Sequence, residues 1–148
     1  RPRWHLRAEP PTRHAVTPDD ERLLRAIADQ SDAYWNARDS AALGAMFADD
    51  AQLRMASREP VVSRTAITGY FRDSFARVEP AMRHVTRITR LQELAPGVVI
   101  ADGEVSLERV TADGKRETVR RFLNHTVLVK TDGSWRFKAL RVHPQPAI

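Results

Sequence analysis

The longest runs of apolar residues alternating with polar ones lie near the end of the chain, from Lys115 to His143. Two runs rich in Val, Leu, Phe and Thr flank Asp132-Gly133, and an Asp-Gly pair between such runs favours a β-hairpin. Side chains of a strand alternate between two faces. In the first run, one face therefore holds Phe122, Asn124, Thr126 and Leu128, and the other holds Leu123, His125, Val127 and Val129. Because both faces are largely apolar, we expect both to be covered.

Helical patterns fill the first half of the chain. Thr17-Pro18 followed by two acids is typical of a helix start, because Thr caps the helix and Pro fits its first position. Apolar residues at helical spacing then continue to 36–39. We expect shorter helices from Ser40 to Phe47 and from Arg64 to Val78, with an extended run from Ala51 to Ala56 between them.

Two further strands are predicted from Met82 to Leu94 and from Val98 to Val110, each closed by a turn that contains Gly. Successive strands joined by short turns form an antiparallel meander. Helices first and a sheet afterwards indicate the α+β class. We expect a single domain over residues 17–148, preceded by an extended, Pro-rich arm over residues 1–16 whose deletion changes stability little.

Composition narrows the function classes. The chain has 148 residues, of which 42% are hydrophobic, and this suits one packed domain. No apolar run approaches the roughly 20 residues of a membrane span. The sequence has no cysteine, which excludes disulfides, thiolate nucleophiles and Cys-ligated metals. No pair of ligands at motif spacing indicates a metal, so we expect neither a metal nor a cofactor.

The net charge of +5 is unevenly distributed. Four arginines against one glutamate give residues 1–16 a charge of +3, so the rest of the chain carries only +2. Because residues 17–148 are this close to neutral, nucleic-acid binding by this part of the chain is not expected. The chain begins with Arg1, which a cleaved signal peptide or a shortened chain would both explain. Cytoplasmic and exported locations therefore both stay open.

Several motifs resemble those of the nuclear transport factor 2-like superfamily, in its SnoaL-like branch. They are Tyr34-Trp35-Asn36-Ala37-Arg38-Asp39, Met46-Phe47-Ala48-Asp49-Asp50-Ala51, Arg64-Thr65-Ala66-Ile67 and Asp132-Gly133-Ser134-Trp135-Arg136-Phe137. The resemblance covers about residues 19–143. It implies a cone, in which three helices close the hollow of a strongly curved mixed or antiparallel sheet. In such proteins the hollow commonly holds a small hydrophobic molecule, and the outer sheet face commonly forms a homodimer.

Ketosteroid isomerase belongs to the same superfamily and can be compared position by position. Its carboxylate base falls on Met55, its phenolic donor on Ser31 and its carboxylic acid donor on Asn124. Without a base at Met55, proton abstraction beside a carbonyl has no agent at that position. The comparison therefore argues against a steroid isomerase that works in the same way.

Scytalone dehydratase is a second relative of this type. Its pocket histidine is similar to His84 and its pocket asparagine to Asn124, but its tyrosine and aspartate fall near Trp35 and Asn36. The Tyr-Asp partnership is therefore not expected here. His84 shares a largely apolar strand face, which favours a neutral imidazole able to act as a base. Asn124 is either a satisfied core amide or a hydrogen-bond donor aimed into a cavity.

Three function classes follow from the sequence. The first is a small-molecule pocket with cofactor-free acid-base chemistry, such as an isomerase, dehydratase or cyclase. The second is a non-catalytic binding or dimerisation module. The third is a binder of nucleic acid or an anionic surface that uses the N-terminal arm and the arginines of the sheet. In the first class His84 and Asn124 are the candidate catalytic residues. The candidate ligand-binding residues, several of which can equally be core residues, are Ser31, Tyr34, Trp35, Met55, Phe71, Phe75, Met82 and Leu128.

Overall fold

The computed structural model describes residues 16–146. These residues form helices α1 (Pro18–Asn36), α2 (Ser40–Ala45) and α3 (Arg64–Phe75). The strands are β1 (Phe47–Met55), β2 (Val61–Val62), β3 (Met82–Ala95), β4 (Val98–Val110), β5 (Arg116–Thr131) and β6 (Ser134–Pro144). Residues 1–15, which make up almost all of the predicted arm, lie outside the described part of the chain.

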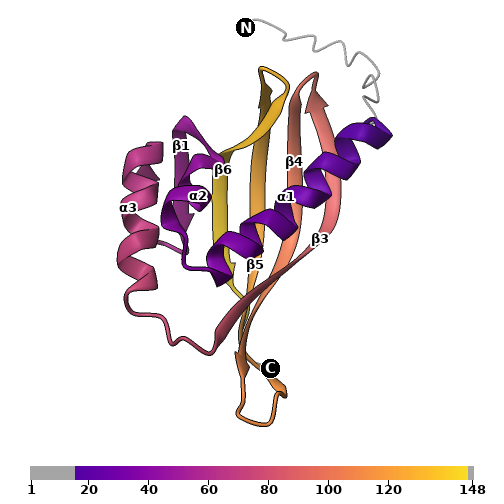
Figure 1. Ribbon diagram of the computed structural model, residues 1–148. Helices are drawn as coiled ribbons and strands as arrows, with labels where there is room; N and C mark the ends of the chain where they lie inside the picture. Colours follow the sequence, from indigo (N-terminus) through magenta and orange to yellow (C-terminus); the bar gives the residue numbers. More distant parts are fainter. Residues whose placement is uncertain (1–15, 147–148) are drawn as a thin grey trace, which may run out of the picture.

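The six strands form one curved, unclosed sheet in the order β2-β1-β6-β5-β4-β3. The four long strands β3 to β6 run antiparallel to their neighbours, as the turn pattern predicts, and β1 pairs with β6 in parallel. Helix α1 crosses the concave side of this sheet, and α3 lies beside β1 (Figure 1). The predicted α+β class with a curved, mixed sheet is therefore confirmed.

Local chemistry explains where the helices begin. The Thr17 hydroxyl accepts a hydrogen bond from the Asp20 amide, and a proline follows it at the first position of α1. Asp39 caps α2 in the same way through the amide of Ala42, at 2.9 Å. Ser63 caps α3. These caps satisfy amides that the first turn of a helix leaves without partners.

Two predicted boundaries are wrong. Phe47 belongs to β1 and not to the preceding helix, because its side chain is 1% exposed and packs edge-on against Phe137 of β6. The Phe137 amide donates to the Met46 carbonyl, so sheet pairing replaces the helix at that point. Helix α3 stops at Phe75, three residues before the predicted Val78. At Phe47, tertiary packing outweighed the helical propensity of the preceding residues.

The core lies between the helices and the concave side of the sheet. On β5 the buried residues are Thr126 and Leu128, while Leu123 and His125 on the opposite face are exposed. The alternation of the two faces is thus as predicted. The prediction that both faces are covered is not met within one chain, because helices pack on one face only (Figure 1).

Among residues 16–146, no helix combines the length and the apolar character needed to cross a bilayer.

Candidate functional site

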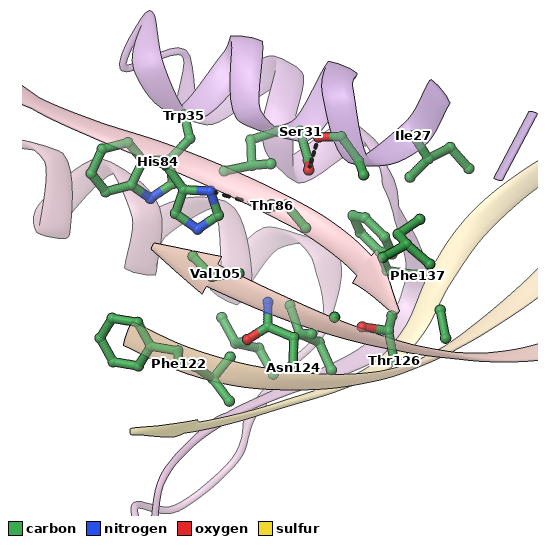
Figure 2. Close-up of a pocket in the computed structure, with 18 of the residues that line it drawn as sticks. Ile27, Ser31, Trp35, His84, Thr86, Val105, Phe122, Asn124, Thr126 and Phe137 are labelled. Carbon is green, nitrogen blue, oxygen red and sulfur yellow. Dashed lines mark hydrogen bonds between the residues drawn. The ribbon is translucent and has the colours of Figure 1, made fainter. Parts of the chain in front are cut away.

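A cavity of about 240 Å³ lies between α1, α3 and the concave side of the sheet. Its walls are mostly aliphatic and aromatic. Polar side chains enter it from several elements, notably His84 and Thr86 of β3 and Asn124 of β5 (Figure 2). A mostly apolar hollow with a few convergent polar groups is the usual composition of a small-molecule site.

His84 is held by a carboxylate on α1. Its Nδ1 lies 2.6 Å from Asp32 Oδ1, and the two side chains are only 19% and 15% exposed. The Trp35 ring stacks on the imidazole, with centroids 5.1 Å apart and planes 29° apart. Figure 2 shows the imidazole between α1 and the interior of the cavity. The expected apolar setting of His84 is therefore corrected, because one ring nitrogen faces a carboxylate.

Asp32 accepts two more hydrogen bonds. Its Oδ2 takes the backbone N–H of Thr86 at 2.7 Å, and its Oδ1 takes the Thr86 hydroxyl at 2.7 Å. Three donors around one carboxyl group suit its ionised form, which only accepts. The Nδ1 of His84 then carries the proton, which leaves the lone pair on Nε2. This tautomer can take up a proton at Nε2.

The backbone of His84 is clamped as well. The Asn36 amide nitrogen donates to the His84 carbonyl at 3.1 Å, and the Asn36 oxygen accepts from the His84 amide at 2.7 Å. Arg38 donates to the carbonyls of Glu79 and Met82, both at 2.9 Å. Burial and the nearby Arg83 charge lower the pKa of Arg38 from its usual value. The end of α1 thus fixes where β3 begins.

Asn124 has no comparable support. Its Oδ1 is buried, and within residues 16–146 it has no hydrogen-bond partner. A buried polar atom left in this way costs roughly 1–3 kcal/mol. Of the two readings of Asn124 that the sequence left open, the satisfied core amide does not fit this oxygen.

The cavity lining includes most of the residues predicted for it. His84, Asn124, Ser31, Trp35, Met55, Phe71 and Leu128 all line it. Tyr34, Phe75 and Met82 do not, so their predicted place in the lining is corrected. Phe75 forms a layer behind the lining, because its ring stacks on Phe71 at 5.8 Å and meets the edge of Trp35 at 5.5 Å.

Ser31 lines the cavity, but its hydroxyl donates to the Ala28 carbonyl of the same helix at 2.9 Å (Figure 2). Serine hydroxyls inside helices commonly bond in this way. The donor that Ser31 was expected to offer in place of a phenol is therefore already in use.

Sequence reasoning missed Asp32. The comparison with scytalone dehydratase placed its aspartate near Asn36, one helical turn further along, and concluded that its partnership is absent. A signal was available, because Ala28, Asp32 and Trp35 follow one another at spacings of four and three on one helix face. An acid on the inward face of an amphipathic helix needs a partner. Here that partner is His84.

Within residues 16–146, no cluster of three or more His, Asp or Glu side chains has an arrangement that would hold a metal ion.

Comparisons with known proteins agree on the fold. No curated protein matches the sequence. A domain of unknown function with a cystatin-like fold from Nostoc punctiforme has a TM-score of 0.77 at 17% identity, covering 89% of this chain and 81% of that one. ActVI-ORFA from Streptomyces coelicolor has a TM-score of 0.73 at 20% identity, covering 84% and 97%.

A ketosteroid isomerase-like protein from Erwinia carotovora atroseptica has a TM-score of 0.68 at 15% identity, covering 88% of this chain and all of that one (100%). Identities this low show a shared fold alone. The family model described as a SnoaL-like domain matches residues 19–141, which is most of the chain. The chain belongs to the SnoaL-like domain family.

Proposed function

We propose that this protein binds a small, largely apolar molecule in the cavity and catalyses a cofactor-free proton transfer on it. The observation that carries the proposal is the Asp32–His84 pair, at 2.6 Å, on the same cavity as Asn124, whose Oδ1 has no hydrogen-bond partner within residues 16–146. A positioned base with a buried carboxylate behind it, opposite a polar anchor, is the arrangement that acid-base catalysis needs.

The proposed chemistry starts at His84 Nε2, which removes a proton from a carbon next to a substrate carbonyl. Asp32 stabilises the imidazolium that forms. The amide nitrogen of Asn124 donates to the carbonyl oxygen while negative charge develops on it. The imidazolium then returns its proton to another carbon, which gives an isomer. Alternatively, it protonates a departing hydroxyl group, which gives water and an alkene.

Two features support this reading over a steroid isomerase of the usual design. Met55 lines the cavity where the carboxylate base of that enzyme falls, so His84 takes over the role of the base. The cavity of about 240 Å³ is also small for a four-ring ligand. It lies below the roughly 300–1,000 Å³ of typical small-molecule pockets, which favours a compact ligand of one or two rings.

The second candidate is a non-catalytic binding module of the same fold, which the loss of the carboxylate at Met55 favours. The two candidates differ in one observable. A binding module takes up the ligand without moving protons on it, whereas the proposed enzyme accelerates exchange of the acidic C–H.

We also propose a homodimer formed through the outer sheet face. Leu123 is 36% exposed there, and His125 pairs with Asp102 at 2.9 Å on the same face. Val127 and Val129 extend this half-covered apolar surface along β5. A second copy of the chain would remove the apolar side chains from water.

Hydrogen–deuterium exchange at C1 of 2-tetralone tests the proposed function. This two-ring ketone carries an acidic CH₂ beside its carbonyl, and its exchange with D₂O is followed by NMR. We expect the protein to accelerate the exchange, and His84→Ala to abolish the acceleration while leaving the fold intact. Binding of 2-tetralone without acceleration would favour the binding module. Absence of binding would overturn both candidates.

A further inference from the structure

Gly103 is a buried glycine in the interior of β4, on the cavity wall. Glycine weakens a strand interior, because it has no side chain to pack and loses more backbone freedom on folding. A glycine at such a position therefore needs a structural reason or marks a close approach by something else.

Two of the structural reasons for a glycine do not apply to Gly103, which lies opposite the register shift between Ile88 and Arg90 of β3. Gly97, Gly114 and Gly133 have positive φ angles of 72°, 79° and 78°, a conformation that favours glycine, but Gly103 does not. Gly44 is pressed against a neighbour, since an added Cβ would lie 1.9 Å from the Thr68 hydroxyl oxygen. A Cβ on Gly103 would meet nothing nearer than 3.5 Å, which is an ordinary contact.

The position of Gly103 points to the ligand instead. It is the direct cross-strand partner of Asn124 in the antiparallel pair β4–β5, so both residues project to the same cavity face. The bare backbone of Gly103 therefore lies beside the amide whose oxygen has no partner in residues 16–146. A larger side chain at this position would occupy the space next to Asn124.

We propose that Gly103 is a specificity-determining residue, which admits a second ring beside the polar group that Asn124 binds. The inference rests on the proposed function and names the ligand class more closely. The ligand is a flat molecule of two fused rings with one hydroxyl or carbonyl group. The polar group meets Asn124, and the adjoining ring lies over the backbone of Gly103.

The test titrates 2-naphthol and phenol into the wild type, Gly103→Ala and Gly103→Val, followed by ligand fluorescence. Because one methyl group in an apolar pocket changes binding about tenfold or more, Gly103→Ala should weaken 2-naphthol by about tenfold and phenol by less than about threefold. Gly103→Val should weaken 2-naphthol further. The melting temperature of the alanine variant should match or exceed that of the wild type, since its new methyl group makes ordinary contacts only.

Gly69→Ala is the matched control, because Gly69 lies on α3 outside the cavity lining and its added methyl group should change neither affinity. Equal losses for both probes, or no loss for 2-naphthol in a folded Gly103→Ala, would overturn the role of Gly103 alone. Failure of the wild type to bind either probe would instead overturn the proposed function and, with it, this inference. If Gly103→Val does not fold, the alanine variant decides the question.

Discussion

Asp32 and His84 are 52 residues apart in the chain, yet their side chains meet at 2.6 Å where α1 crosses β3. The contact depends on two further features of that crossing. Thr86 donates two further hydrogen bonds to Asp32, and Asn36 bonds both the amide and the carbonyl of His84. The imidazole is therefore fixed through both its ring and its backbone.

Replacing Asp32 by Asn should remove most of the catalysis. An Asn side chain has one acceptor oxygen, for which the two Thr86 donors would compete with His84, and no charge to stabilise the imidazolium. We expect acceleration of 2-tetralone exchange to fall roughly 100-fold or more, within the range attributed to general base catalysis. Asp29→Asn, an exposed acid on the same helix, is the control and should have full activity. Similar rates in the two variants would contradict the role of Asp32.

The two asparagines should respond in opposite ways to leucine. Asn124→Leu removes a buried amide whose oxygen has no partner in residues 16–146 and leaves no void, because leucine is the larger residue and faces the cavity. Stability should therefore stay within about 1 kcal/mol or rise. Asn36→Leu leaves the backbone groups of His84 without partners and should cost roughly 1–3 kcal/mol. Chemical denaturation measures both. A strongly destabilised Asn124→Leu that still binds 2-naphthol normally would show a structural role only.

The structure also accounts for how far sequence reasoning could go. The strands β3 to β6 were predictable because alternation and turn residues are local signals, as at Asp132-Gly133. The start of β1 was not predictable, because Met46 and Phe47 follow a helix-forming segment. Phe47 is extended because it pairs with β6, which is distant in the sequence.

Two residues of the candidate site, His84 and Asn124, were predictable from the sequence, whereas Asp32 and Gly103 were not. Alternation placed Asn124 on an inner face, and the family resemblance drew attention to His84. Asp32 was missed because two helices can be aligned one turn out of register and still show the same apolar face. Gly103 was not singled out from the sequence, because the role of a glycine can be judged only when its φ angle and neighbours are known.

The pH dependence of stability should include a contribution from Asp20. Hydrogen bonds from the Trp135 indole and from Lys130, both at 3.0 Å, lower the pKa of this carboxyl group below its usual value. A depressed pKa in the folded state contributes stability above the unfolded value, and this contribution disappears as the pH falls through the folded one. Asp20→Asn should therefore cost about 1 kcal/mol at pH 7.

The difference between the wild type and Asp20→Asn should shrink as the pH falls below about 4. Urea denaturation at pH 7 and at successively lower pH values measures it. A difference that stays constant, or grows, in acid would contradict the assignment of the pKa shift to the folded state.

Leu123→Lys tests the proposed homodimer. A lysine at this position would place a new charge in the proposed interface and should disfavour burial of that face against a second copy. Sedimentation at micromolar concentration should show a dimer for the wild type and a monomer for the variant. Leu94→Lys, another exposed leucine, which lies near the end of β3, is the comparison and should leave the dimer intact. A monomeric wild type would contradict the proposal.

The most direct test of the ligand site is the ¹⁵N NMR spectrum of the histidine rings during titration with 2-naphthol. If the ligand binds between His84 and Asn124, the Nε2 resonance of His84 should shift and saturate with the ligand. The exposed His125 and His143 serve as internal controls, and their resonances should not move. Saturable binding of 2-naphthol with an unchanged His84 resonance, or with equal shifts at His125, would contradict the proposed site.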